Sequence, residues 1–291
     1  MPPNSPKSRL FMQCDVFSTT PLGGNGLAVV LDATGLDEET MQRFARWTNL
    51  AETTFVCPPS DPSADYDIRI FTVSRELPFA GHPTLGTAAC WLAAGNIPKS
   101  AGVIRQNCTV GLVDIDLTGD LPAFIAPPTS VAPMSPDTLQ AITTGLNIDP
   151  DRVTAHAVLD NGPVWHAIEL KSSQDVLALD ADSIAPIKGL AVRLIAPHDT
   201  GGVDYEVRMF SMWSGLTEDP ITGSLNAALA HWMQTQGRTR SPYVVAQGTC
   251  IGRSGRVHVI ARADDPDDDP DNGPVRIGGH TNILIEGRVT L

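Results

Sequence analysis

An internal repeat is the feature that most constrains the fold of this chain. Residues 68–89 have the sequence IRIFTVSRELPFAGHPTLGTAA, and residues 207–228 have the sequence VRMFSMWSGLTEDPITGSLNAA, with their shared motif offset by about 137 positions. Each copy contains an apolar–Arg–apolar–Phe run, a connection, and the pattern (H/D)-P-x-x-G-(T/S) leading into alanines. A strand-to-helix unit that occurs twice predicts two half-domains that face one site.

The polar residues in equivalent positions of the two copies differ. His82 of the first copy aligns with Asp219 of the second, and Thr87 aligns with Ser224. A lone histidine, or an aspartate before a proline, is most often structural. Equivalent positions in two matched copies favour a functional role instead. The repeat therefore predicts an enzyme whose two halves contribute different polar groups.

Length and composition predict two domains and exclude some partners. A chain of 291 residues exceeds one average domain, and its 42% hydrophobic content is enough for a packed core. The net charge of −13 argues against nucleic acid or an anionic membrane as the main partner. Residues 264–271, DDPDDDPD, lack the ligand spacing of a calcium loop and predict a solvated surface loop.

No segment predicts a membrane-spanning, secreted or metal-binding protein. No apolar run approaches the roughly 18 residues that a bilayer requires, and the start, MPPNSPKSRL, lacks an apolar signal region. The 5 cysteines form no CxxC pair, and the histidines show no HxxxH spacing. We therefore expect a cytoplasmic protein with reduced thiols and no metal site.

Hydrophobic periodicity predicts strands and helices in both halves of the chain. In the first half we predict helices at 37–48 and 83–94 and strands at 10–17, 26–31, 52–57 and 68–72. In the second half we predict helices at 136–145 and 220–236 and strands at 155–159, 165–170, 191–195, 205–211 and 256–261. We interpret the proline-rich segment 122–136 as the linker between the halves.

The predicted fold is α+β, with one mixed-sheet half-domain used twice. We place the N-terminal half-domain at residues 1–127 and the C-terminal half-domain at 128–279. The strand-like end of the chain, 280–291, is expected to return to the N-terminal half-domain.

The start of each repeated helix has the features of an anion site. Proline is tolerated in a first helical turn, glycine lets a ligand approach the backbone, and the helix dipole adds partial positive charge. We expect the hydroxyl groups of Thr87 and Ser224 to lie near unpaired N–H groups at these starts. The two helix starts would then bind a carboxylate or an enolate-like oxygen.

Glu52 is the third candidate for chemistry, beside His82 and Asp219. It lies in NLAETTFV, where small or apolar residues flank it at the start of a strand. Apolar surroundings raise the pKa of a carboxyl group, which suits a group that both takes and gives a proton. We predict Glu52, His82 and Asp219 as the catalytic residues.

Several motifs together resemble a known family. The segments DVFSTTPLGGN, NLAETTFV, IRIFTVSRELPFAGHPTLGTA and EDPITGS are similar to those of the phenazine-biosynthesis PhzF-like isomerase family, which has the diaminopimelate epimerase fold. The similarity extends over essentially the whole chain. It implies two pseudo-symmetric half-domains, each a mixed β-sheet wrapped around a central helix, with the active site in the cleft between them. It also implies a homodimer and a reaction without a cofactor.

The resemblance implies a role for each candidate residue. Glu52 corresponds to the family's glutamate in the ETTF motif, the general acid/base, while His82 and Asp219 are expected to contact the substrate and assist the proton transfer. A substrate carboxylate is expected at Ser224 and at the N–H groups of the glycines that open the two helices. The implied substrate-binding residues are Gly81, Gly223, Ser224, Asn25 and Thr87.

The resulting prediction is an isomerase that moves a proton between two carbons of a small carboxylate-bearing metabolite. An amino-acid epimerase or racemase is the alternative enzyme. The epimerases of this fold use two cysteines, one from each half, and neither repeat position holds a cysteine here. The alternative of another class is a small-molecule binding protein without turnover, which would need no proton carrier.

Overall fold

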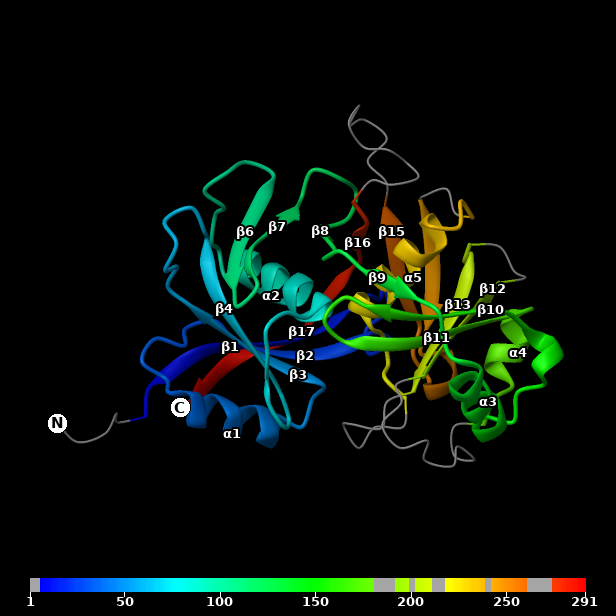
Figure 1. The fold of residues 1–291 in the computed structure, drawn as a ribbon. Helices are drawn as coiled ribbons and strands as arrows, with labels where there is room; N and C mark the ends of the chain where they lie inside the picture. Colours follow the sequence, from blue (N-terminus) through cyan, green and yellow to red (C-terminus); the bar gives the residue numbers. More distant parts are fainter. Residues whose placement is uncertain (1–5, 181–191, 199–201, 211–217, 239–241, 261–273) are drawn as a thin grey trace. The chain divides into compact units, whose positions relative to one another are not determined.

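The computed structural model describes residues 6–180, 192–198, 202–210, 218–238, 242–260 and 274–291. The chain forms two compact units. Unit 1 contains the residues up to Ile125 together with Gly278–Leu291, and unit 2 contains Ala126–Ile277. Figure 1 shows that each unit combines strands with a helix labelled α2 in unit 1 and α5 in unit 2.

The sheet of unit 1 joins both ends of the chain. Its strands pair in the order β17 (Thr281–Thr290), β1 (Ser8–Val16), β2 (Asn25–Val30), β3 (Glu52–Cys57), β4 (Tyr66–Thr72), β6 (Val103–Cys108), β7 (Gly111–Asp116) and β8 (Ala123–Ile125). The short β5 (Glu76–Leu77) also pairs with β4. The red strand β17 lies beside the blue strand β1 in Figure 1, so the C-terminal end of the chain completes this sheet.

The sheet of unit 2 repeats this arrangement. Its strands pair in the order β9 (Ser130–Ala132), β10 (Val153–Asp160), β11 (Val164–Leu170), β12 (Val192–Pro197), β13 (Tyr205–Phe210), β14 (Tyr243–Gln247) and β15 (Gly255–Ile260). Antiparallel and parallel pairs alternate from β10 to β15 as they do from β1 to β7. The duplication seen in one motif therefore extends through both sheets. Strand β16 (Arg276–Gly278) lies where the chain leaves unit 2.

Helices occupy matching places in the two units. In unit 1, α1 (Glu38–Thr48) follows β2 and α2 (Gly81–Ala93) precedes β6; in unit 2, α4 (Ser173–Leu177) follows β11 and α5 (Gly223–Gln234) precedes β14. Helix α3 (Pro136–Gly145) and the 3₁₀ turns η1 (Pro150–Arg152) and η3 (Thr249–Ile251) complete the described elements. Across the described ranges, every helix is too short or too polar to cross a lipid bilayer.

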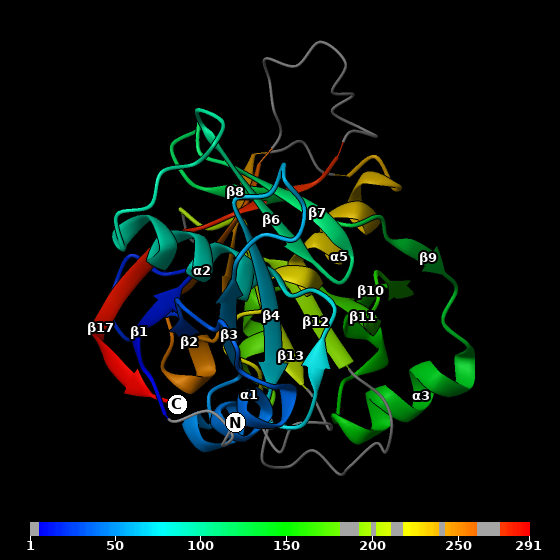
Figure 2. The same ribbon diagram turned by 90° about the vertical axis from the view of Figure 1, so that its left-hand side faces the viewer.

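Helices α1 and α2 cover opposite faces of the unit 1 sheet, as Figure 2 shows. Met41 and Phe44 of α1 pack with Val30 and Phe55 in one buried cluster. On the other face, a Cβ atom on Gly86 of α2 would lie 2.6 Å from a methyl group of the β2 leucine. Only a glycine lets α2 approach the sheet this closely.

Helix α1 has the boundaries that its capping residues predict. Asp37 is the N-cap and accepts a hydrogen bond from the Thr40 N–H at 2.8 Å. Asn49 ends the helix in the left-handed conformation, with φ of 55°. The predicted helix at 37–48 is confirmed.

The predicted starts of the two repeated helices are wrong in opposite directions. Helix α2 begins at Gly81, two residues before the predicted position, because the Thr84 N–H already donates to the Ala80 carbonyl at 3.2 Å. Helix α5 begins at Gly223, three residues after the predicted position, because the Thr222 N–H donates to a glutamine side chain instead. Relative to the alignment of the two copies, α5 therefore starts later than α2 by more than one helical turn.

Two further predictions concern the connections. The boundary between the two units, after Ile125, falls within the segment 122–136 that we expected to be the linker, and this segment also contains the short strands β8 and β9. Short strands of 3 residues carry too little periodicity to be predicted among prolines. The acidic run 264–271 falls outside the described residues.

The repeated apolar–Arg–apolar–Phe run has a structural basis. The guanidinium of Arg69 lies 5.1 Å above the ring of Phe71 and donates to Glu76 at 2.5 and 2.7 Å. Arg208 lies 4.8 Å above Phe210, and it donates to Glu218 at 2.7 and 3.1 Å while both charged groups are buried. In each copy the arginine ties its strand to the connection that leads to the central helix.

We predict that Gly24→Ala lowers the free energy of unfolding by about 1–3 kcal/mol. A Cβ atom at Gly24 would lie 2.3 Å from the backbone oxygen of Val16, which cannot move without breaking the β1–β2 pairing. Urea unfolding followed by circular dichroism measures the change. The control is Gly26→Ala in the same segment, where a Cβ atom would meet only a leucine methyl group at 3.5 Å. Equal effects of the two substitutions would contradict the prediction.

Candidate active site

Strand geometry places Glu52 on the face of the unit 1 sheet that carries α2. Side chains alternate between the faces of a strand with a period of 2. In β3, the Thr54 hydroxyl contacts the Thr87 hydroxyl of α2 at 2.8 Å, while Phe55 packs in the cluster that contains α1. Glu52 is the first residue of β3 and shares the face of Thr54. It therefore points toward the start of α2.

Glu52, His82 and Asn25 form the first half-site, within unit 1. Nε2 of His82 lies 3.2 Å from Oε2 of Glu52. On the other side of the ring, Nδ2 of Asn25 lies 3.5 Å from Nδ1 of His82. His82 and Asn25 are buried, and the Glu52 side chain is 17% exposed. The carboxylate is thus the member of this half-site that solvent reaches.

The histidine in this half-site is neutral at physiological pH. Burial lowers the pKa of His82 from 6.5 to about 3, because the charged ring would lose its hydration. An amide nitrogen only donates, so with Asn25 Nδ2 beside it, Nδ1 of His82 accepts and the ring proton lies on Nε2. The contact between His82 and Glu52 is then a hydrogen-bond donor facing a carboxylate rather than an ion pair.

A glycine turn holds Asn25 in place at the start of β2. The Gly24 N–H donates to the buried carboxylate of Asp15 at 2.7 Å. Asn25 shares the α2 face of its strand with Leu27, which contacts Gly86. The glycine turn at residues 21–25, PLGGN, thus places the Asn25 amide beside the His82 ring.

The structure corrects the expected position of Thr87. This residue is fully buried in the second turn of α2, and its hydroxyl contacts that of Thr54 rather than lying near the N–H groups of a helix start. The physical reason is the earlier start of α2, which leaves the unpaired donors at Gly81 and His82. Thr87 instead links α2 to the strand that begins with Glu52.

The second half-site, within unit 2, is built around Asp219 at the approach to α5. The Asp219 N–H donates to the Met209 carbonyl at 2.9 Å, so the backbone at Asp219 pairs with strand β13. The Thr222 hydroxyl donates to Oδ2 of Asp219. Gln247, at the end of β14, donates to the Asp219 carbonyl at 3.3 Å. Asp219 is half-buried.

The start of α5 is suited to an anion. Thr222 is its N-cap in an extended conformation without a side-chain cap bond, and the first turn contains no acidic residue. The N–H groups of Gly223 and Ser224 are among those that an α-helix leaves without a backbone partner. Ser224 is half-buried, and its carbonyl accepts from Asn161 Nδ2 at 2.8 Å. Ser224 therefore lies in the first turn of α5, as the prediction for its hydroxyl requires.

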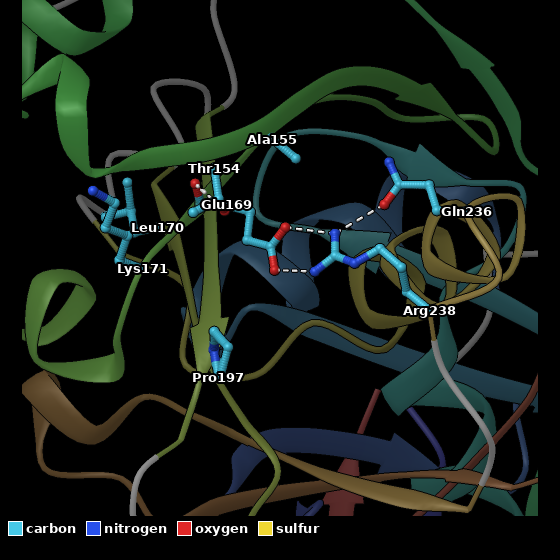
Figure 3. Close-up of a pocket in the computed structure, with 8 residues that line it drawn as sticks. All are labelled: Thr154, Ala155, Glu169, Leu170, Lys171, Pro197, Gln236 and Arg238. Atoms are coloured by element: carbon cyan, nitrogen blue, oxygen red, sulfur yellow. Dashed lines mark hydrogen bonds and ion pairs between the residues drawn. The ribbon is translucent and has the colours of Figure 1, made fainter.

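Other features of the described chain offer no rival site. A surface pocket of about 450 Å³ in unit 2 is lined by residues that include Glu169 and Arg238. Figure 3 shows that these two side chains form a bidentate ion pair across the pocket, and that the guanidinium also donates a hydrogen bond to Gln236. None of the candidate residues lines it. In the described ranges, no three His, Cys, Asp or Glu side chains converge as metal ligands would.

Comparison with known proteins identifies the family of this chain. The sequence profile of the phenazine biosynthesis-like protein family, PhzC-PhzF, matches residues 14–287. The chain belongs to this family. It is 32% identical to the trans-2,3-dihydro-3-hydroxyanthranilate isomerase of Pseudomonas aeruginosa over 97% of this chain and 99% of that protein.

Solved structures show the same fold over the full chain. A PhzF-family phenazine biosynthesis protein of Bacillus anthracis matches with a TM-score of 0.83 and 21% identity, covering 98% of this chain and 100% of the other. A predicted epimerase of Pseudomonas aeruginosa matches with a TM-score of 0.76 and 27% identity, covering 97% and 99%. The α+β prediction and the resemblance to PhzF-like proteins are confirmed, and the chain is an isomerase of this family.

Sequence reasoning missed several residues that build the two half-sites. Thr54 lies two residues after Glu52, so the period of a strand could have placed both side chains on one face. Gln247 follows the repeated helix as Gln106 does, and that echo was the available signal. Asn161 carried no signal, because its hydrogen bond joins residues 63 positions apart. Thr222 lies within the EDPITGS motif, but the motif does not show that its hydroxyl donates to Asp219.

We predict that the His82 ring stays neutral from pH 8 down to pH 5. Its carbon-bound proton resonance, assigned by comparison with His82→Gln, should not titrate in that range. Because the pKa is lowered in the folded state, the unfolded state binds the extra proton between pH 6.5 and about 3. Stability is then lost as the pH falls through this window, by about 1.4 kcal/mol per unit at most. His82→Asn should show a shallower loss in urea unfolding. A ring that titrates near pH 6.5 would contradict the assignment.

Proposed function

We propose that this PhzF-family isomerase moves a proton between two carbons of a small carboxylate-bearing metabolite, with Glu52 as the general acid/base. The observation that carries the proposal is the contact of 3.2 Å between Glu52 and a buried, neutral His82. Of the groups in the unit 1 half-site, the carboxylate is the one that solvent reaches, and a carboxyl group can both take and give a proton.

In the unit 1 half-site, we assign different roles to the two carboxylate oxygens of Glu52. Nε2 of His82 lies 3.2 Å from Oε2 of Glu52, so the buried ring restricts the orientation of the carboxyl group. Oε1 then takes a proton from one substrate carbon, and Glu52 becomes a carboxylic acid. The same oxygen returns the proton to a second carbon, and the substrate double bond shifts between them. Protons and electrons balance without an external oxidant or reductant.

The half-site of unit 2 supports a role in binding and charge stabilisation. Removing a proton from carbon pushes negative charge toward the substrate's carboxylate oxygens. The N–H groups and hydroxyl at Gly223 and Ser224 suit that charge, as do the N–H groups at the start of α2. We propose that Asp219 orients the substrate through a polar group.

The names of the relatives support a proposal for the substrate class. The Pseudomonas aeruginosa relative is named for trans-2,3-dihydro-3-hydroxyanthranilate, an unsaturated cyclic amino acid. We propose a substrate of this chemical kind, in which a conjugated system carries the charge between the two carbons. An epimerase is the second candidate, because a structural neighbour with 27% identity is named a predicted epimerase. Location in the cytoplasm and a homodimeric state stay predictions, the latter open to light scattering.

We expect carbon-bound deuterium to appear in substrate when the protein is incubated in D2O with cyclic unsaturated and amino acids. Glu52→Gln should lower the rate of this exchange by at least about 100-fold, because it removes the only proton carrier of the half-site. Proton and carbon NMR measure the exchange. The matched control is Glu286→Gln, an exposed glutamate on β17, which should keep the full rate.

The products separate the rival functions. A shifted double bond identifies an isomerase of the proposed kind, whereas an inverted stereocentre identifies an epimerase. Exchange that survives in Glu52→Gln would remove Glu52 from its role. A ligand that binds with no exchange under any condition would favour a binding protein.

A further inference from the structure

Gln247 is a buried hydrogen-bonding centre in unit 2. It is fully buried at the end of β14. Its Oε1 accepts from the Thr222 N–H at 3.1 Å and from Asn226 Nδ2 at 2.9 Å. Its Nε2 donates to the Thr222 hydroxyl at 3.2 Å and to the Asp219 carbonyl at 3.3 Å. One amide therefore holds the backbone and side chains of the whole turn from Asp219 to the start of α5.

These contacts form a directed chain that ends on the Asp219 carboxylate. The Nε2–H of Gln247 donates to the Thr222 oxygen, and the Thr222 hydroxyl proton is donated to Oδ2 of Asp219. A hydroxyl that accepts one hydrogen bond becomes a stronger donor in the next. Because Thr222 has one hydroxyl proton, the amide also decides the direction in which it points. The hydrogen bond from the Thr222 hydroxyl thus orients the Asp219 carboxylate.

The equivalent glutamine in unit 1 has a related place. Gln106, also fully buried, donates through Nε2 to the Thr84 hydroxyl at 2.9 Å. That hydroxyl donates in turn to the Ala80 carbonyl at 2.9 Å, in the first turn of α2. Both copies of the repeat therefore use a glutamine from the following strand to brace the helix start. The series of hydrogen bonds in unit 2 ends on a carboxylate, whereas the one in unit 1 ends on a backbone carbonyl.

We propose that Gln247 and Thr222 are positioning residues with separable tasks, an inference that rests on the proposed function and deepens it. The amide oxygen of Gln247 holds the Thr222 N–H and so sets the start of α5, where the substrate anion binds. The amide nitrogen acts through the Thr222 hydroxyl and sets the orientation of Asp219. The first task controls binding and the second controls turnover.

The first test needs no substrate. Amide hydrogen exchange by NMR on the full chain should show the Thr222 N–H protected in the unsubstituted protein and at least about tenfold faster in Gln247→Leu, because its acceptor is gone. Thr222→Val keeps the amide and its acceptor, so its exchange should stay within about twofold. The matched control is Gln106→Leu, which removes an equally buried glutamine but should leave the amide of residue 222 unchanged. Unchanged protection in Gln247→Leu would overturn the role of the amide oxygen.

The second test uses the substrate found by deuterium exchange. Thr222→Val should lower kcat about tenfold with KM nearly unchanged, since it frees the carboxylate to rotate but keeps the helix start. Thr222→Ser retains the hydroxyl and should restore kcat. Gln247→Leu should lower kcat and raise KM together. Equal kcat in the valine and serine variants would overturn the role of the hydroxyl, whereas a common fall in Tm without this split would reduce both residues to a structural role.

The two tests distinguish the failure of this inference from the failure of the proposed function. If no acid is turned over, the proposed function fails, and the exchange of the Thr222 amide still decides whether Gln247 sets the start of α5. If turnover is found and Thr222→Val leaves kcat unchanged, the proposed function stands and the positioning of Asp219 through Thr222 is wrong. A Gln247→Leu chain that does not fold leaves the valine and serine pair as the deciding comparison.

Discussion

The close approach of α2 to one face of its sheet is the constraint on which the unit 1 half-site depends. Gly86 lets the helix lie against the side chains of β1 and β2, and the Thr54–Thr87 hydroxyl pair fixes its position along β3. Because side chains alternate along a strand, the same face presents Asn25 and Glu52 to the first turn of the helix. The His82 ring meets both residues as a consequence of this packing.

Burial of that ring then decides its chemistry. A histidine on the surface would titrate near neutral pH and compete with Glu52 for the proton. Inside unit 1 its pKa falls to about 3, so the ring stays neutral beside the Glu52 carboxylate. Packing thus makes the two neighbouring groups different, with a ring that stays neutral and a carboxylate that we propose as the proton carrier. Among the described contacts of unit 2, the Asp219 carboxylate accepts a hydrogen bond from the Thr222 hydroxyl, which in turn accepts one from the Gln247 amide.

The duplication explains which parts of the fold could be predicted. Matched arginine–phenylalanine pairs, helix capping at Asp37 and Asn49, and the (H/D)-P-x-x-G motif are local patterns, and each led to a correct element. The repeat failed at the helix starts, where Thr87 and Ser224 align in sequence but lie in different turns. A helix starts where its first N–H groups lose other partners, and in unit 2 the competing partner is Gln247, 25 residues beyond Thr222.

The sequence by itself determined that the chain is a duplicated α+β protein of the PhzF family with Glu52, His82 and Asp219 in its motifs, because those patterns are contained in short runs of residues. Tertiary structure decided what each of them does. The neutral state of His82, the use of Thr87 as a core link, and the control of Asp219 by Thr222 and Gln247 all depend on burial and on contacts between strands and helices far apart in the chain. Desolvation and hydrogen-bond direction are properties of packed neighbours, and a linear sequence does not contain them.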